Sequence, residues 1–99
     1  MNWCPIIFLL DVLSKRWTLH ILKSISDWNN WFNDIKRSIN WISAKILSER
    51  LTELENQLFI ERKLINTKPL RVEYTFSKKG KSLEDVIKYI NNWAIENNK

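Results

Sequence analysis

The sequence predicts a mainly helical α+β domain, in which four helices precede a β-hairpin and a fifth helix follows it. Three observations predict this fold class. Apolar residues recur at the three- and four-residue spacings of helices as far as Leu58. Residues 70–76 then alternate between apolar and polar side chains, as in a half-buried strand. Helical spacing returns after Gly80, the only glycine of the chain.

Length and composition limit the classes of protein and partner. Ninety-nine residues fit one domain, spanning 1–99, whose modest core would leave apolar surface for a second copy to cover. With 44% hydrophobic and 27% charged residues, the composition is that of an ordinary globular protein. The net charge of +5 favours a polyanionic partner such as double-stranded DNA, although a basic protein without one fits the charge equally well.

The residues that usually carry chemistry argue against an enzyme and against a membrane protein. His20 has no second histidine or cysteine near it, and one glycine allows no glycine-rich phosphate loop, so we expect no metal, cofactor or catalytic site. Cys4, the single cysteine, excludes an internal disulfide and favours the reducing cytoplasm. The apolar run 6–10 lacks a signal peptide's basic flank and is far shorter than the roughly 20 residues that span a bilayer.

We interpret the apolar run as part of a buried first helix. Pro5 suits the first helical position, with Cys4 as the N-cap and an end near Leu13. Because nearly all its side chains are apolar, a partner subunit is expected to cover one side. The last helix likewise has a broader apolar face than docking on one small domain needs. Together the two helices form the expected homodimer interface, which includes Ile6, Ile7, Leu10, Ile87, Ile90 and Trp93.

The middle of the chain has the pattern of a helix-turn-helix. Ser14 is expected to cap a second helix that ends in the polar turn 26–30, and a short third helix follows. A tight connection leads to a helix over 42–55, for which Ser43 is a good N-cap. Its N-terminal half has a polar face with short side chains, as a recognition helix needs to reach base edges. The apolar stripe opposite consists of Leu47, Leu51, Leu54 and Leu58.

A β-hairpin is predicted directly after the recognition helix. Residues 59–65 and 70–76 are its strands, and turn-forming residues separate them. Lys68 and Arg71 lie near the tip, where they would meet the DNA backbone or the minor groove. A basic hairpin in this place is a wing, so the predicted fold is a winged helix-turn-helix. Residues 77–80 are expected to form a turn before the last helix.

The sequence resembles the HxlR family of bacterial and archaeal winged-helix regulators over nearly its whole length. The matching motifs include Cys4-Pro5, Lys15-Arg16-Trp17-Thr18-Leu19, Phe32-Asn33-Asp34-Ile35, Ile42-Ser43, Leu51-Thr52-Glu53-Leu54-Glu55, Pro69, Arg71-Val72-Glu73-Tyr74-Thr75-Phe76 and Gly80. The resemblance implies a homodimeric DNA-binding regulator that dimerises through its first and last helices. Some members of the family sense oxidants or electrophiles through the cysteine that matches Cys4.

Leu58 departs from the family pattern. It stands where the family usually has the glycine that ends the recognition helix. A branched side chain disfavours the left-handed conformation of that position. We therefore expect Asn56 or Gln57 to take up the turn instead.

The candidate DNA contacts divide into base-reading and phosphate-binding side chains. Lysine can donate to guanine, glutamate can accept from cytosine and serine can do either, so the base-reading candidates are Ser43, Lys45, Ser48 and Glu49. Alternatively, Lys45 and Glu49 pair with each other on a solvated face. Arg50, beside the apolar stripe, either contacts a phosphate or pairs with a glutamate. The other phosphate candidates, which add affinity but little specificity, are Lys36, Arg37, Lys68 and Arg71.

The sequence leaves two questions open. Cys4 lies at a helix N-terminus, where unpaired amides stabilise a thiolate and favour oxidant sensing through the partner's Cys4 or a small thiol. A lone cysteine on an apolar helix is, however, more often a buried hydrophobic residue. The alternative function is a winged-helix module that binds protein or RNA, with Trp28, Trp31 and Trp41 as its docking surface. The basic wing favours DNA over this alternative.

Overall fold

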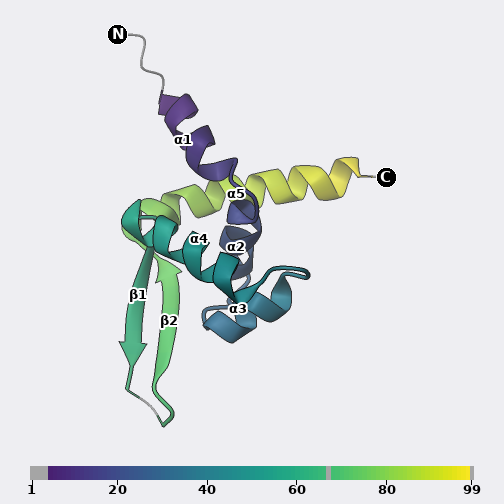
Figure 1. Cartoon of the computed structure of the whole chain (residues 1–99). Coiled ribbons are helices and arrows are strands. Elements are labelled where there is room, and N and C mark those ends of the chain that lie inside the picture. Colours follow the sequence, from purple (N-terminus) through teal and green to yellow (C-terminus); the bar gives the residue numbers. More distant parts are fainter. Residues whose placement is uncertain (1–4, 67, 99) are drawn as a thin grey trace.

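Five helices and one hairpin make up the part of the chain that a computed structural model describes, residues 5–66 and 68–98. The elements follow the predicted order (Figure 1). They are α1 (Pro5–Leu13), α2 (Thr18–Ser26), α3 (Phe32–Ser38), α4 (Ala44–Asn56), β1 (Ile60–Ile65), β2 (Arg71–Phe76) and α5 (Lys78–Asn97). The predicted winged helix-turn-helix is confirmed.

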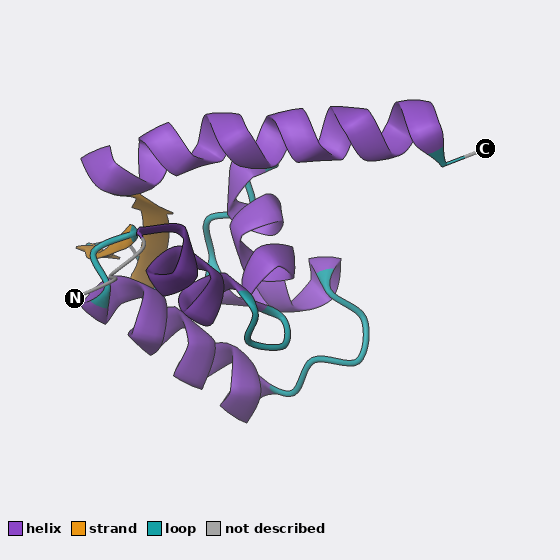
Figure 2. Ribbon diagram, turned by 90° about the horizontal axis from the view of Figure 1, so that it is seen from above, coloured by secondary structure: helices purple, strands orange, loops and turns teal. Residues whose placement is uncertain are grey.

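Helix α2 lies at the centre of the fold. It contacts α1, α3, α4, α5 and β2. Helix α5 crosses above the helix-turn-helix and its C-terminal half extends beyond it, whereas the hairpin projects from the other side of the body (Figures 1 and 2). The core is formed by buried aliphatic and aromatic side chains from α2, α3, α4 and α5 and from the start of the hairpin, among them Ile21, Leu22, Ile35, Leu47, Leu51, Leu54, Phe59, Ile60, Leu83 and Ile87.

The predicted leucine stripe fixes how α4 is rotated about its axis. Leu47, Leu51 and Leu54 are at most 1% exposed, as predicted, and only Leu58 lies outside the core. Burial of a leucine side chain stabilises a fold by about 1.5–3 kcal/mol. Turning α4 about its axis would expose all three leucines, so its polar side chains are held on the opposite, outer face.

One predicted helix cap is confirmed and another is wrong. Ser43 caps α4, because its Oγ accepts from the backbone N–H of Ile46 at 3.1 Å. Ser14 does not cap α2, which begins only at Thr18. Trp17 precedes this start in a left-handed conformation, with φ of 77°, and its side chain packs against the core. This packing, rather than a hydroxyl cap, sets the start of α2.

The end of α4 differs from the expectation, because Leu58 itself adopts the left-handed conformation, with φ of 66°. The Leu58 N–H donates to the Glu55 carbonyl and the Phe59 N–H donates to the Leu54 carbonyl, each at 3.0 Å. These two bonds form a Schellman motif, in which the buried side chains of Phe59 and Leu54 supply the usual apolar pair. The tertiary packing of Phe59 therefore imposes a conformation that leucine disfavours.

Leu58→Gly is expected to stabilise the protein. The substitution removes the clash of Cβ with the backbone, which costs about 1–2 kcal/mol in the left-handed region, and it deletes a side chain that is 67% exposed. Urea unfolding should show a gain of about 1 kcal/mol. Leu58→Ala is the matched control, since it keeps Cβ and should give no such gain. Equal stability changes for the glycine and alanine variants would contradict this account.

The wing is an antiparallel pair of strands. Ile60 of β1 pairs with Phe76 of β2, and Ile65 pairs with Arg71. The segment before α3 extends this pairing, because Trp31 forms a bridge with Glu73. The root of the wing is thereby attached to the helix-turn-helix.

Gly80 lies inside α5, which corrects the predicted turn at residues 77–80. Helix α5 begins at Lys78, and Ser77 caps it by accepting from the Gly80 N–H at 3.0 Å. The Phe59 carbonyl oxygen accepts a hydrogen bond from the Ser77 N–H at 3.1 Å. The same oxygen lies against Gly80, only 1.8 Å from the position that a Cβ on Gly80 would occupy. The glycine is thus required by close backbone approach and not by a turn.

Gly80→Ala is expected to destabilise the protein, although alanine normally favours a helix interior by about 1 kcal/mol. The added methyl group would displace the Phe59 carbonyl from the junction between α4, the wing and α5, at a cost of about 1–3 kcal/mol. Urea unfolding measures the change. Ser82→Ala, at an exposed position in the same helix, is the control. A Gly80→Ala variant that is more stable than the unmodified protein would contradict this account, because it would show that the Phe59 carbonyl can move aside at little cost.

Helix α1 is not buried within one chain, contrary to the expectation. It contains no buried residue, and Ile6, Ile7, Phe8 and Leu10 are between 44% and 58% exposed. The helix projects from the body, with only its last turns against the core (Figure 1). Within residues 5–66 and 68–98, no helix combines the length and apolar character needed to cross a membrane.

Candidate nucleic-acid interface

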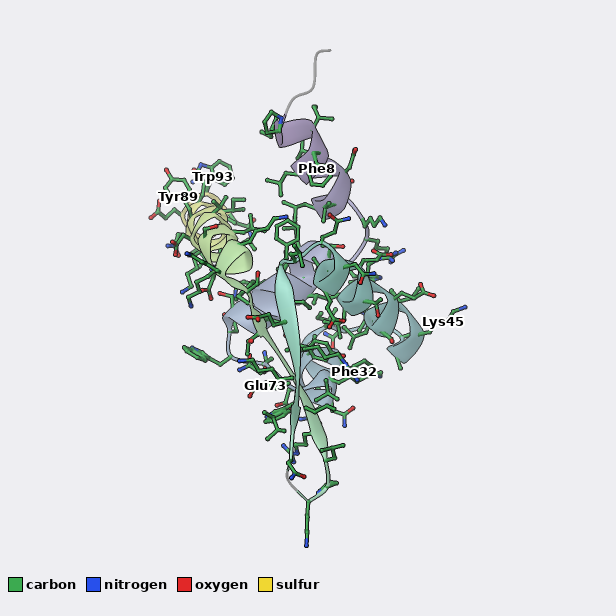
Figure 3. The ribbon with its side chains drawn as sticks, turned by 90° about the vertical axis from the view of Figure 1, so that its left-hand side faces the viewer. Phe8, Phe32, Lys45, Glu73, Tyr89 and Trp93 are labelled. Carbon is green, nitrogen blue, oxygen red and sulfur yellow. The ribbon has the colours of Figure 1, made fainter. Side chains whose placement is uncertain are left out.

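The outer face of α4 carries the four candidate base-reading residues. Ser43, Lys45, Ser48 and Glu49 are all exposed. Lys45 projects from the N-terminal end of α4, to the right of the hairpin in Figure 3. The Ser43 hydroxyl is partly committed, because its oxygen caps the helix.

Lys45 and Glu49 do not pair with each other. Neither takes part in an ion pair with another residue of the described chain. The alternative of a simple surface pair is therefore not what the structure shows. Both charged groups face solvent beside the exposed hydroxyl of Ser48, which gives α4 donors and acceptors in its first two turns.

The candidate phosphate-binding cations differ in whether they already contact another side chain of the chain. Lys36 and Lys68 are exposed on α3 and in the wing loop. Arg37 forms an ion pair with Asp34 one turn earlier. Arg71 is exposed near the tip of the wing, and its Cζ lies over the ring of Trp31, 5.2 Å from the centroid.

The sequence allowed Arg50 either a phosphate contact or a structural pair with a glutamate, and the structure shows the pair. Its side chain is only 18% exposed, and its Nε donates to the Arg16 carbonyl at 3.0 Å. Its Nη1 pairs with Glu53 at 3.1 Å, and Glu53 in turn pairs with Lys15 at 3.3 Å. Arg50 therefore clamps α4 to the connection between α1 and α2, and we do not retain it as a phosphate contact.

A groove separates the wing from α3. Its volume is about 460 Å³, and it is lined by Trp31, Phe32, Asn33, Asp34, Arg37, Pro69, Leu70, Arg71 and Val72. Phe32, which lines the groove, and Lys45 both lie to the right of the hairpin in Figure 3. The groove is thus formed by the start of α3 and the wing.

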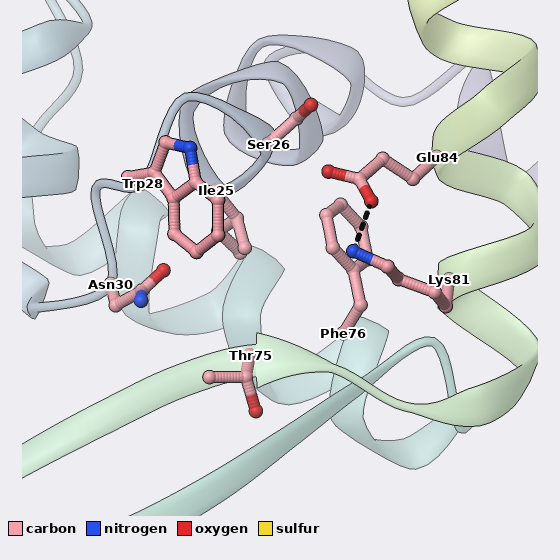
Figure 4. A pocket seen from close by; sticks show the side chains of 8 residues that line it. All are labelled: Ile25, Ser26, Trp28, Asn30, Thr75, Phe76, Lys81 and Glu84. Atoms are coloured by element: carbon pink, nitrogen blue, oxygen red, sulfur yellow. Dashed lines mark ion pairs between the residues drawn. The ribbon is translucent and has the colours of Figure 1, made fainter.

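A smaller hollow of about 140 Å³ lies on another side of the wing, between α2, β2 and α5 (Figure 4). Glu84 lines it and is only 5% exposed. Burial raises the pKa of this carboxyl, but hydrogen bonds from Lys81 and Ser26 and the charges of Lys81 and Lys88 outweigh burial and hold the pKa below its ordinary value. Glu84 is therefore ionised at neutral pH, and we interpret it as a structural link between α5 and α2.

The candidate dimer residues fall into two groups. Ile6, Ile7, Ile90 and Trp93 are between 55% and 61% exposed and Leu10 is 50% exposed, so these side chains are available to a second copy. Ile87 is only 6% exposed and belongs to the chain's own core, so it offers little surface to a partner. Tyr89 and Trp93 stand out from the same side of α5 in Figure 3 and extend the exposed apolar face. Cys4 lies outside the described residues.

The HxlR-like helix-turn-helix family model matches residues 12–99. The chain belongs to this family. The HTH-type transcriptional regulator YvaP of Bacillus subtilis is 37% identical over 87 residues, which cover 88% of this chain and 81% of YvaP. YodB of the same organism is 37% identical over 84 residues, which cover 85% of this chain and 75% of YodB. The chain is thus a transcriptional regulator of the HxlR type.

Solved structures resemble the whole described fold. The reduced form of YodB matches with a TM-score of 0.80 and 35% identity, covering 93% of this chain and 91% of YodB. The reduced form of the redox regulator HypR matches with a TM-score of 0.86 and 27% identity, covering 97% of this chain and 95% of HypR. YodB has also been solved after diamide treatment and with a bound quinone, and HypR in an oxidised form.

Sequence reasoning missed the contact between Trp31 and Arg71. It considered Trp31 only as part of an aromatic docking surface. The two residues are far apart in the chain, and no spacing rule connects the start of α3 with the wing. Only the pairing of Trp31 with Glu73 brings the indole beside Arg71.

Proposed function

We propose that the protein is a cytoplasmic homodimer that binds a pseudo-palindromic operator and regulates transcription, without enzymatic activity. The observation that carries this proposal is the common surface formed by α4 and the wing. Lys45, Ser48 and Glu49 offer base-reading groups on it, and Lys68 and Arg71 offer cations for the backbone. A net charge of +10 for two copies, twice the +5 of one chain, would strengthen the attraction to DNA.

The exposed apolar helices support a dimer. Helices α1 and α5 expose large apolar side chains in one chain. Ile7 and Trp93, for example, are more than half exposed, and an exposed apolar patch of this kind marks an interaction site. A second copy that covers them would relate two recognition helices by a two-fold axis. The half-sites would then lie about 10 bp apart, or a multiple of this distance, in successive major grooves.

Alanine substitutions should separate base reading from backbone binding. Lys45→Ala and Ser48→Ala should weaken binding to the preferred sequence by about 1–3 kcal/mol and leave random DNA largely unaffected. Arg71→Ala should weaken all sequences alike and reduce the slope of log K against log salt concentration by about 0.9. Fluorescence anisotropy measures both, with a duplex from upstream of the protein's own gene and a random duplex at two salt concentrations.

Lys88→Ala is the control for lost charge, because Lys88 is an exposed cation on α5, away from the proposed surface. Equal losses on both duplexes for Lys45→Ala would contradict base reading by that residue. Absence of sequence-preferring binding by the unmodified protein would contradict the proposed function and favour a protein- or RNA-binding module.

We also propose that operator binding depends on the thiol of Cys4. Support comes from relatives whose structures were solved in reduced and in oxidised or diamide-treated forms. Because the chain has one cysteine, a disulfide must join Cys4 of two copies or Cys4 and a small thiol. Two thiols lose two electrons and two protons to diamide as the S–S bond forms.

Diamide should abolish tight binding of the unmodified protein and leave Cys4→Ser unaffected. The same anisotropy titration, run with and without diamide and reversed with dithiothreitol, measures the effect. Binding that diamide does not change in the unmodified protein would contradict the sensing role and leave Cys4 a structural residue. It would not affect the DNA-binding proposal.

A further inference from the structure

We propose that Trp31 is a positioning residue for DNA binding, which holds the Arg71 guanidinium ready for a backbone phosphate. The proposal rests on the proposed function, because it assigns a role within the same surface. Trp31 lies at the start of α3, outside both the recognition helix and the wing strands. Its contribution therefore adds a third element to the interface.

The contact itself is a cation–π interaction. The Arg71 Cζ lies over the Trp31 ring, 5.2 Å from the centroid, within the roughly 6 Å range in which the ring attracts a cation. Tryptophan is the aromatic side chain that binds cations best, and arginine is the more frequent partner. A flexible side chain near the tip of the wing is thereby confined to a smaller set of conformations.

Trp31 can position Arg71 because its own backbone is fixed to the strand that carries Arg71. Trp31 forms a β-bridge with Glu73, two residues beyond Arg71 on β2. The neighbouring Asn30 carbonyl accepts from the Tyr74 N–H at 2.8 Å. The backbone of Trp31 is therefore attached to the strand that carries the Arg71 guanidinium.

The donors of Arg71 remain available in this arrangement. They lie in the plane of the guanidinium, so an aromatic ring over one face leaves the N–H groups at the edge. No described residue forms an ion pair with Arg71, whereas Arg37 is paired with Asp34 and Arg50 with Glu53. Of the two arginines that line the groove, Arg71 is thus the one without an ion pair to another described residue.

The groove gives these donors a place at which to act. Trp31 and Arg71 both line the 460 Å³ groove between α3 and the wing, and Arg71 is exposed there. Phe32, which also lines the groove, lies on the same side of the hairpin as Lys45 in Figure 3. A DNA strand that runs from the recognition helix to the wing would pass over it. The ligand group is therefore a backbone phosphate, which carries no sequence information.

A double-mutant cycle tests the proposal on a random 30-bp duplex (a length of about three helical turns), labelled for fluorescence anisotropy. The variants are Trp31→Leu, Arg71→Met and the two combined, with Trp31→Phe to retain an aromatic ring. Trp31→Leu should weaken binding about two- to five-fold, the equivalent of one exposed cation–π contact. Trp31→Phe should lose less. In the Arg71→Met background, Trp31→Leu should have no further effect.

Trp28→Leu is the matched control, since Trp28 is 84% exposed and lines the hollow beside Glu84 rather than the groove. Thermal unfolding of each variant shows whether the fold is retained, and Trp31→Phe serves if Trp31→Leu does not fold. Equal losses for Trp31→Leu with and without Arg71 would overturn the proposal, because a general structural role would persist in both backgrounds. Unmodified protein that does not bind the duplex would overturn the proposed function as well.

Discussion

The burial of one leucine stripe on α4 is the constraint on which the rest of the structure depends. Leu47, Leu51 and Leu54 meet the core from α2 and α3, and this contact leaves one orientation for the polar side chains opposite. Arg50 adds a second restraint, because it binds the carbonyl of Arg16 in the α1–α2 connection. Packing therefore decides which face of α4 is exposed, and the proposed base-reading residues lie on that face.

The wing is positioned by backbone contacts as much as by side chains. The Phe59 carbonyl accepts from Ser77 and lies against Gly80, so the end of α4, the last residue before α5 and α5 itself meet at one point. On the other side, the pairing of Trp31 with Glu73 attaches β2 to the start of α3. These two attachments hold the hairpin at a defined angle to α4, as the proposed binding of both to one DNA duplex requires.

The order of elements and the leucine stripe could be predicted because they follow from local periodicity. Several boundaries could not, because tertiary contacts override local preference there. Trp17, Trp28, Trp41 and Leu58 all have positive φ, a conformation that bulky residues disfavour and that no sequence rule assigns to them. Gly80 signals a turn by composition, yet it serves close packing inside a helix. The exposed face of α4 was predicted, whereas the contact of Trp31 with Arg71 depends on strand pairing far along the chain.

Hydroxyl-radical footprinting of the protein on a genomic fragment from upstream of its gene tests the central claim most directly. The account predicts two protected stretches related by a two-fold axis, centred about 10 bp apart or a multiple of this distance, with flanking protection from the wings. Arg71→Ala should lose the flanking protection and keep the two central stretches. Protection without two-fold symmetry, or flanks that do not depend on Arg71, would contradict the arrangement of a recognition helix and a basic wing on one DNA-binding surface.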